Sequence, residues 1–478
     1  MKRPTVASRA GRALGLNLVN TMVSRLGTLA IGIALARILG PEEFGTFAVA
    51  LLALLAVLSF SELGVSLAIV RWPDSPREIA PTVSTISILS SIIFCAVSVA
   101  AAPWFCAAMG APDATSVVRV LAFSVIISGA VAAPAALLQR EFRAGRRMLI
   151  DQVSNWLGAI VSIVTAVGGM GAMSLGVGRL AGATAGAVRF IWSEPVRFGW
   201  NREIARKLLK FGLPLAGSSI VVFSVKYVDQ FVVGSVIGPV ALGFYVLAFN
   251  LSSWPIAVFS QPVREVSPAA FARLQHDPTA LRSAFIVSLG LLTAVTLPVC
   301  LVLTGAADPL IAMVYGLAWT PSAAALGWLG VLAGVRIVFE LVYDYFVVLG
   351  STRVVFTVQV AWLIALVPAL YVGAHLAGIA GAAAAHVCVA LFVVLPLYLV
   401  ELRRAGIAWR PLAAGVAVPL LYSGAVALVA LAAARIIALD VLAVAVACTA
   451  ALVALAFEAR RMRAALHQLR SVIAGGTS

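Results

Sequence analysis

The sequence predicts an all-α integral membrane protein of about 14 transmembrane helices, arranged as two six-helix lobes followed by two further helices. Three observations lead to this fold class. Hydrophobic residues make up 62% of the chain and charged residues only 11%, a composition typical of proteins that cross a membrane many times. Apolar segments of about 20 residues, each long enough to cross a bilayer, recur along the whole chain. A Gly-Pro turn also occurs twice, at equivalent places in the two predicted lobes.

The first predicted lobe covers residues 1–193, and a basic linker at 194–210 closes it. The first helix follows the basic residues Lys2, Arg3, Arg9 and Arg12. It is too long for a signal-peptide core and lacks a small-residue cleavage site, so we expect it to be retained. The six helices of this lobe are predicted at 14–38, 45–70, 79–102, 116–138, 148–168 and 172–192.

The second predicted lobe, residues 211–400, repeats this plan, and residues 401–478 add helices thirteen and fourteen and a cytoplasmic tail. Because each lobe has an even number of helices, both lobes enter the membrane with the same orientation. We therefore expect a pseudo-twofold axis along the membrane normal to relate them. The helices of this part are predicted at 211–236, 240–262, 283–304, 322–348, 353–373, 377–400, 412–433 and 438–457.

The repeated turn motif begins at Gly40-Pro41 in the first lobe and at Gly238-Pro239 in the second. In each copy a further glycine follows four residues after the proline, and long apolar segments lie on both sides. Proline cannot continue a helix from the preceding residue without losing a hydrogen bond. Each copy therefore predicts a tight turn between two helices.

The loop charges predict the orientation in the membrane. Nearly all basic residues outside the helices fall on the side that holds both termini, and only Arg37 and Arg435 lie in loops of the other side. Basic loops are retained in the cytoplasm, so we expect both termini to be cytoplasmic. The Ala- and Arg-rich composition indicates a bacterium of high GC content, and in a Gram-negative bacterium the expected location is the inner membrane. The net charge of +15 is explained by this topology and does not indicate nucleic-acid binding.

Five segments carry a resemblance to a known family. With these segments, the chain resembles Wzx-type polysaccharide repeat-unit flippases of the multidrug/oligosaccharidyl-lipid/polysaccharide exporter superfamily, in the branch of colanic-acid exporters. The similarity extends over roughly residues 10–400, and the last two helices match only as hydrophobic helices. The segments are RILGPEEFG at 37–45, LQREFR at 138–143, FGLPL at 211–215, VDQFVVG at 228–234 and PAAFARLQ at 268–275.

The resemblance implies a transporter and not an enzyme. Its expected cargo is an oligosaccharide repeat unit linked to undecaprenyl diphosphate, moved from the cytoplasmic to the periplasmic leaflet by alternating access. The polymer served would be an exopolysaccharide, a lipopolysaccharide O-antigen or a capsule. The implied partners are this lipid-linked oligosaccharide, membrane lipid, and a polymerase with its export machinery. No Walker sequence, catalytic Ser/His/Asp pattern or metal-ligand spacing of Cys and His occurs in the chain, so no catalytic residue, metal or bound cofactor is expected.

Two other functions stay open at this point. One is a multidrug transporter or a transporter of lipid-linked peptidoglycan precursors from the same superfamily. The other is a membrane enzyme, such as a polymerase that uses polyprenyl-linked sugars. Such enzymes usually have a sizeable periplasmic loop with catalytic residues, whereas the longest outer loops expected here, 103–115 and 305–321, are short and contain no Lys or Arg.

Three basic residues lie several positions from either end of their predicted helices: Arg25, Lys226 and Arg336. A diphosphate that crosses the membrane needs cationic partners, so these residues are candidates for substrate binding. Arg25 and Lys226 lie on corresponding helices of the two lobes, where both could face one diphosphate. The alternative is neutralisation within the helix, of Lys226 by Asp229 and of Arg336 by Glu340.

Three other basic residues within helices have simpler explanations. Arg119 and Arg189 lie near helix ends and can reach the headgroups. Arg179 lies on a helix in which Gly178, Gly182 and Gly186 form a stripe for close helix packing.

Four acidic residues are also predicted to lie within the membrane: Glu62, Asp229, Glu340 and Asp344. Arg336, Glu340 and Asp344 recur every four residues and so share one face of a helix. A carboxylate inside a membrane helix is a candidate for a functional site. Coupling to H⁺ or Na⁺, which the resemblance implies, and a salt bridge that locks or gates helices are both open for these four acids.

Two tryptophans have contrasting expected environments. Trp319 lies at the end of a predicted helix, as in the belt of aromatic residues at a membrane interface. Trp362 lies within a helix, where packing against other helices is the favoured role over stacking on sugars.

Overall fold

The computed structural model describes residues 6–61, 65–72, 75–141, 143–260, 271, 274 and 277–475. Within these ranges, the side chains of residues 6–26, 67, 70, 71, 144, 215, 218, 221 and 462–475 lie outside the description. The described chain is α-helical, with short 3₁₀ and π segments and no strand.

The predicted fold class, an all-α membrane protein, is confirmed. Ten helices in the described part of the chain are long and apolar enough to cross a membrane. Two of them, at 27–61 and 352–404, contain a break, at Gly40 and at Ala377-Gly378. Counting the segments on either side of the two breaks separately gives twelve helices. With α6 and α7 the total is 14, and these helices correspond one to one with the predicted spans.

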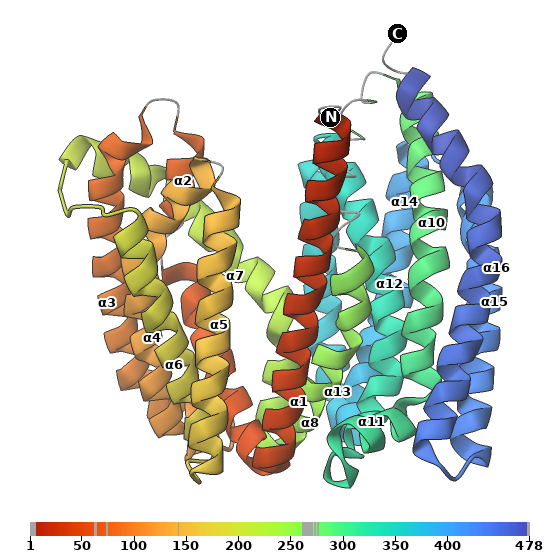
Figure 1. Cartoon of the computed structure of the whole chain (residues 1–478), viewed down its shortest axis with the longest axis horizontal. Helices are drawn as coiled ribbons and strands as arrows, with labels where there is room; N and C mark the ends of the chain where they lie inside the picture. Colours follow the sequence, from red (N-terminus) through yellow and green to blue (C-terminus); the bar gives the residue numbers. More distant parts are fainter. Residues whose placement is uncertain are drawn as a thin grey trace, which may run out of the picture. The chain divides into compact units, whose positions relative to one another are not determined.

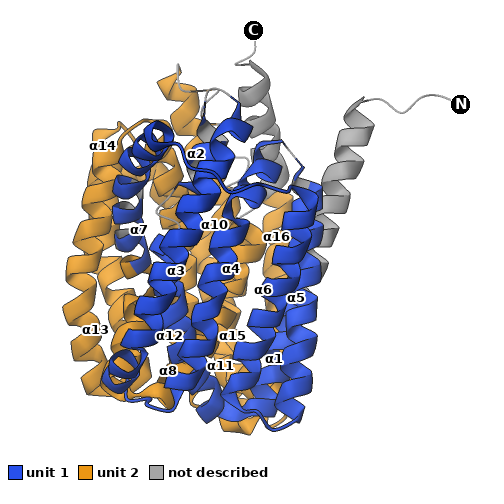
Figure 2. Ribbon diagram, turned by 90° about the vertical axis from the view of Figure 1, so that its left-hand side faces the viewer, with its two compact units in different colours: residues 1–223 blue, residues 224–478 orange. Residues whose placement is uncertain are grey.

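The chain divides into two compact units, residues 1–223 and 224–478 (Figure 2). Unit 1 contains α1 to α6 and the beginning of α7 (Figure 1). The bounds of these helices are Val6–Ser61 for α1, Ser66–Arg71 for α2, Pro76–Ala108 for α3, Ala114–Arg140 for α4, Ala144–Val167 for α5, Ala172–Ser193 for α6 and Arg202–Ile237 for α7.

Unit 2 contains the rest of α7 and the elements that follow it. Its elements are α8 (Pro239–Ser252), the π turn η1 (Ile256–Ser260), α10 (Pro278–Gly305), α11 (Ala307–Tyr315), the 3₁₀ turn η2 (Leu317–Trp319), α12 (Ser322–Val348), α13 (Thr352–Val389), the π turn η3 (Ala390–Val394), α14 (Leu395–Arg404), α15 (Trp409–Ile436) and α16 (Asp440–Gly475).

Both Gly-Pro turns form as predicted. Gly40 interrupts α1 with φ 73° and ψ 176°, and Gly238 separates α7 from α8 with φ 106° and ψ 176°. Residues other than glycine almost never adopt this region of backbone conformation. In unit 1 the turn also supports a neighbouring helix, because the backbone N–H of Ala172 donates to Oε2 of Glu43 at 2.6 Å, which places a carboxylate at the N-terminus of α6.

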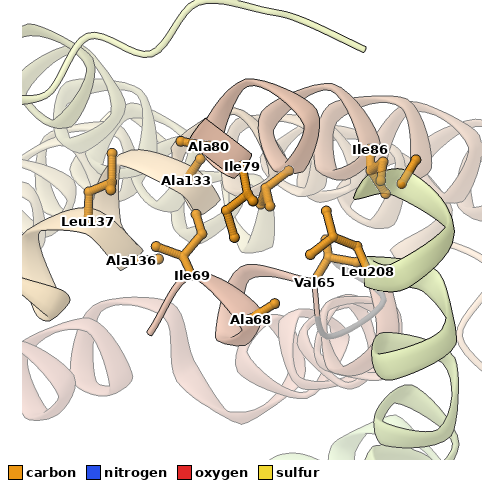
Figure 3. Packing of buried hydrophobic residues seen from close by; sticks show 12 residues of the cluster. Val65, Ala68, Ile69, Ile79, Ala80, Ile86, Ala133, Ala136, Leu137 and Leu208 are labelled. Carbon is orange, nitrogen blue, oxygen red and sulfur yellow. The ribbon is translucent and has the colours of Figure 1, made fainter. Parts of the chain in front are cut away.

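The expected linker at 194–210 is helical from Arg202 onward. Its non-helical part is held against α3, where Oγ1 of Thr85 donates to the backbone oxygen of Gly199 at 2.9 Å. The beginning of α7 then packs into an apolar cluster with α2, α3 and α4, in which Leu208 lies beside Val65 and Ile79 (Figure 3). These contacts explain why the division between the units falls after Phe223, inside α7, and not at the expected linker.

Two predicted helix boundaries are wrong, and so is the expected environment of one tryptophan. The second span was expected to continue to residue 70, but α1 ends at Ser61 and α2 is a separate short helix. The outer loop expected at 305–321 is largely helical, because α11 and η2 occupy it. Trp319 in this segment is only 1% exposed and packs against Phe244 and Tyr315, so it does not belong to an interfacial belt.

Candidate functional site

Unit 1 contains a polar groove of about 640 Å³. Four helices line it: α1, α4, α5 and α6. Its lining includes both apolar and polar side chains, and three of its four helices, α1, α4 and α5, are long and apolar enough to cross a membrane. Polar groups at this depth generally face a water-filled cavity or the interior of a helix bundle, so the groove is a candidate path or binding site for a polar ligand.

Close packing of α5 on α6 forms one wall of the groove. A Cβ atom added at Gly182 would lie 2.6 Å from the backbone oxygen of Ser154 and 3.2 Å from Cα of Gly158. A Cβ atom added at Gly178 would likewise clash with Ser162, and one added at Gly186 would clash with Ser154. The glycine stripe predicted on α6 is therefore confirmed as a packing surface. Arg179, on the same helix, also lines the groove.

A stripe of polar residues on α5 faces the groove. Arg147, Asp151 and Asn155 recur every four residues and therefore share one helix face, and all three line the groove with Gln152. Nε of Arg147 lies 3.9 Å from Oδ2 of Asp151. The sequence analysis missed this stripe, although its repeat in an otherwise apolar helix was visible in the sequence.

Trp156 closes the groove between α5 and α1. Its ring lies against the backbone of Gly27, since a Cβ atom at Gly27 would be 2.7 Å from Cζ2 of the indole. The residue is 41% exposed and is part of the groove lining. The groove therefore combines an aromatic surface with hydrogen-bonding side chains.

A ring of ion pairs lies at one end of unit 1. Arg77 contacts Glu141 at 2.9 Å and Glu194 at 3.2 Å, and Arg143 contacts the same two carboxylates at 3.2 and 2.7 Å. The hydrogen bond from Arg77, together with the charge of Arg143, lowers the pKa of the Glu141 carboxyl below its ordinary value of 4.5. The ring joins the start of α3, the α4–α5 loop and the end of α6.

Unit 2 contains a buried polar cluster around Asp229. Asp229 is fully buried on α7, and its Oδ2 accepts a hydrogen bond of 3.0 Å from Oη of Tyr245 on α8. Nδ1 of His386 on α13 lies 3.7 Å from the same oxygen and has no hydrogen-bond partner among the described residues. Trp362 packs edge-on against His386, which confirms the packing role expected for this tryptophan.

Arg336 on α12 extends this cluster. Its guanidinium lies 5.5 Å from the centre of the Phe249 ring and is close enough to Tyr245 to interact with it electrostatically. Tyr245 and Phe249 stack on each other. The structure therefore brings two of the predicted site residues, Asp229 and Arg336, into one cluster through two aromatic residues of α8.

The other predicted site residues have separate environments. Lys226 is exposed, and its ammonium lies 5.0 Å from the centre of the Tyr227 ring, so the alternative weighed for it, neutralisation by the buried Asp229, is not what the structure shows. Glu340 accepts a hydrogen bond of 2.9 Å from Oγ of Ser260, and Asp344 is 7% exposed. The side chain of Arg25 and the whole of Glu62 lie outside the described residues.

His386 was not singled out from the sequence, because it lies far along the chain from Asp229 and shares no spacing motif with another ligand. No group of three or more His, Cys, Asp and Glu residues in the described part of the chain is placed to hold a metal ion. The candidate site thus consists of the groove of unit 1 and the Asp229 cluster of unit 2.

Comparisons with known proteins give a family and a fold. A model of the family described as "Polysaccharide biosynthesis protein" matches residues 34–324. The succinoglycan biosynthesis transport protein ExoT of Rhizobium meliloti (strain 1021) is 24% identical over 347 residues, which cover 70% of this chain and 69% of that protein. The lipopolysaccharide biosynthesis protein WzxC of Escherichia coli (strain K12) is 21% identical over 373 residues, covering 77% and 76% of the two chains.

Solved structures share the arrangement of helices. The lipid II flippase MurJ, in an inward closed conformation, has a TM-score of 0.73 at 12% identity and covers 93% of this chain and 99% of its own. A multidrug resistance MATE family transporter of the MOP superfamily, in an inward-facing conformation, has a TM-score of 0.65 at 17% identity and covers 79% and 94%. At these identities the similarity shows a common fold.

Proposed function

Because the chain belongs to the polysaccharide biosynthesis protein family, whose model matches residues 34–324, we propose that it is a flippase for polyprenyl-diphosphate-linked oligosaccharide repeat units. It moves them from the cytoplasmic to the periplasmic leaflet of the inner membrane by alternating access, with both termini in the cytoplasm. The polymer assembled from them is an exopolysaccharide, an O-antigen or a capsule.

The family match is the observation that carries this proposal. Two relatives named for the biosynthesis of exported polysaccharides, ExoT and WzxC, support it. The structure adds a physical argument, because a sugar and a diphosphate require polar surroundings at membrane depth. Unit 1 supplies such surroundings in a groove, and unit 2 supplies charged residues within its helices.

We propose Arg25, Lys226 and Arg336 as the cations that bind the diphosphate. Lys226 is exposed on α7 and is therefore accessible to a ligand. The guanidinium of Arg336 lies 5.5 Å from the centre of the Phe249 ring, and a guanidinium over an aromatic ring can still contact phosphate oxygens through its N–H groups.

We propose that Asp229 and His386 couple transport to an ion, and that this ion is a proton. A buried carboxylate is unstable as an anion without a counter-charge, and a neighbouring imidazole can supply one by taking up a proton. The 3.7 Å separation between Nδ1 of His386 and Oδ2 of Asp229 supports this role. Glu62, Glu340 and Asp344 remain candidates for the same coupling or for gating.

Transport in proteoliposomes tests the proposals on the cargo, on the cations that bind the diphosphate and on the coupling ion. A fluorescent undecaprenyl-diphosphate oligosaccharide is placed in one leaflet, and its protection from an external glycosidase is followed over time. We expect wild-type protein to flip the lipid and a pH gradient to accelerate flipping roughly ten-fold, within the usual range of coupling between sites. Lys226→Ala combined with Arg336→Ala abolishes flipping. Asp229→Asn keeps basal flipping but loses the acceleration, whereas Asp308→Asn, at an exposed position on α11, keeps both.

The outcomes separate the alternatives. Folded wild-type protein that flips none of this lipid under any ion gradient would contradict the flippase proposal. In that case, flipping of a lipid-linked peptidoglycan precursor would identify the protein as a transporter of that precursor. Export of a drug would identify it as a multidrug transporter. Acceleration that survives Asp229→Asn would leave transport in place and remove the Asp229 and His386 pair from the coupling.

A further inference from the structure

The groove of unit 1 offers hydrogen-bonding groups of a particular kind. Gln152 and Asn155 on α5 carry amides, and both line the groove. Ser124 on α4 also lines it, but its hydroxyl already donates to the backbone oxygen of Leu121, so it is left as an acceptor. Amides and hydroxyls both donate and accept hydrogen bonds. Sugar hydroxyls do the same, whereas phosphate oxygens of a diphosphate only accept. The lining therefore matches the sugar part of a lipid-linked oligosaccharide better than its diphosphate.

The charges at one end of the groove favour the same assignment. Arg147 lies 3.9 Å from the carboxylate of Asp151, and Arg179 on α6 is a further cation of the lining. A site built mainly for a diphosphate would present several cations without a carboxylate beside them. An arginine and an aspartate side by side instead offer fixed donors and acceptors to neighbouring hydroxyls.

Trp156 supplies the apolar surface that a sugar ring needs. One face of a sugar ring carries mainly C–H groups, and an indole can pack against that face while its other parts remain in polar surroundings. Trp156 lies against the backbone of Gly27, is 41% exposed and is part of the groove lining. It follows Gln152 by four residues, and residues four apart share one face of a helix, so the indole and this amide are neighbours on α5.

The dimensions are also suitable. The lining on α5 extends from Arg147 to Ser162, which at 1.5 Å per residue is roughly 22 Å along the helix. The volume of about 640 Å³ lies within the range of about 300–1,000 Å³ that is typical of sites for small ligands. An elongated groove of this size accommodates a short oligosaccharide.

We propose that the groove between α1, α4, α5 and α6 binds the oligosaccharide of the transported lipid and selects for it. Trp156 packs against a sugar ring, and Gln152 and Asn155 bind hydroxyl groups. This assignment rests on the proposed function, because it takes the oligosaccharide to be part of the cargo. The diphosphate is bound by other residues.

Binding of two lipids to the full-length protein in nanodiscs tests the assignment. One lipid is undecaprenyl diphosphate, and the other is the oligosaccharide-linked form extracted from cells that produce the protein. We expect wild-type protein to prefer the second lipid. Asn155→Leu and Trp156→Leu each lower the affinity for the oligosaccharide-linked form about ten-fold, the effect of losing roughly one good contact. Neither changes the affinity for undecaprenyl diphosphate.

Two controls separate binding from folding. Trp192→Leu removes an indole from α6 that is 82% exposed and does not line the groove, and it leaves both affinities unchanged. Asn155 is exposed on α5, so its substitution removes little buried surface. Asn155→Leu therefore keeps the test valid if Trp156→Leu lowers the melting temperature.

Each other outcome overturns the assignment in a recognisable way. A preference for the oligosaccharide-linked lipid that persists in both groove variants would place sugar recognition elsewhere and leave the flippase proposal intact. An equal loss of affinity for both lipids would show that the groove acts on the diphosphate or on the fold. Wild-type protein that binds both lipids equally has no sugar site, and wild-type protein that binds neither contradicts the proposed function as well.

Discussion

Glu141 illustrates how the basic α4–α5 loop is used within unit 1. The loop was notable in the sequence for its arginines, and the structure shows that two of its side chains, Glu141 and Arg143, belong to the ion-pair ring with Arg77 and Glu194. Isolated ion pairs at a surface contribute little to stability. A ring in which each side chain has two partners contributes more, because each charge is held by several contacts at once.

We predict that Glu141→Gln lowers the melting temperature at pH 7 and that the difference from wild type disappears in acid. The Arg77 hydrogen bond lowers the pKa of the Glu141 carboxyl below 4.5 in the folded protein. Its contribution to stability is therefore complete above pH 4.5 and is lost as the pH falls through the lower folded-state pKa. Melting curves between pH 3 and 8 in detergent measure this.

Glu78→Gln is the matched control for this prediction, because Glu78 is an exposed neighbour of Arg77 on α3 that takes no part in the ring. Its melting temperature should follow that of wild type at every pH. A Glu141 variant whose deficit stays constant down to pH 3 would show that the substitution acts through something other than the charge of this carboxylate.

The pair of helices α5 and α6 determines the shape of the groove. Glycines on both helices bring their backbones into contact at Gly158 and Gly182. In a membrane, such close contacts replace the hydrophobic effect as the main attraction between helices. The same close approach brings the polar stripe of α5 and Arg179 of α6 to one cavity.

We predict that Gly182→Ala destabilises the protein by about 1–3 kcal/mol, the usual cost of overpacking. The new methyl group would lie 2.6 Å from a backbone oxygen of α5, and a backbone atom cannot move aside cheaply. Gly424→Ala on α15 is the control, since no atom lies within 4 Å of a Cβ placed there. It should be neutral or stabilising by up to about 1 kcal/mol, because alanine favours helix. Equal melting temperatures for the two variants would contradict the packing described for α5 and α6.

The distribution of basic residues concerns the whole protein. The structure describes helices long and apolar enough to cross a membrane. The charges of the loops that join them determine which helix ends face the cytoplasm. The asymmetry of the loop charges, with only Arg37 and Arg435 in loops on one side, favours cytoplasmic termini.

We predict that labelling with a membrane-impermeant maleimide confirms this orientation. In a variant without the five native cysteines, Asp113→Cys and Leu439→Cys are labelled from outside intact cells. Asp113 is exposed in the outer loop expected at 103–115, and Leu439 is exposed between α15 and α16. Gly145→Cys, at the start of α5 beside the basic α4–α5 loop, is labelled only after the membrane is permeabilised. Labelling of Gly145→Cys in intact cells would reverse the proposed topology.

Features of the chain that depend on local sequence were predictable. The number of helices, the Gly-Pro turns and the α6 glycine stripe were predicted correctly, because each depends on local rules: the length of an apolar segment, the conformation available to Gly-Pro and the spacing of small residues on a helix. Errors occurred at α2, at α11 and at the start of α7, where contacts with other helices set the boundary.

The candidate site was only partly predictable. Asp229 and Arg336 were identified because a charge within an apolar helix is conspicuous, but their partners Tyr245 and His386 were not, since those residues lie on other helices. The polar stripe on α5 was overlooked because its residues lie close to a basic loop and resembled a helix end.

The sequence by itself determined that this is an all-α membrane protein, because hydropathy and local turn chemistry are properties of short segments, and the match of residues 34–324 to the family model showed its family. Only the tertiary structure decided which polar residues meet. A stripe on α5 becomes a groove when glycines allow α6 to approach, and Asp229 gains His386 when α7 and α13 contribute to one buried cluster. Contacts of this kind join residues far apart in the chain, and they form because a polar group at membrane depth must find a partner within the protein.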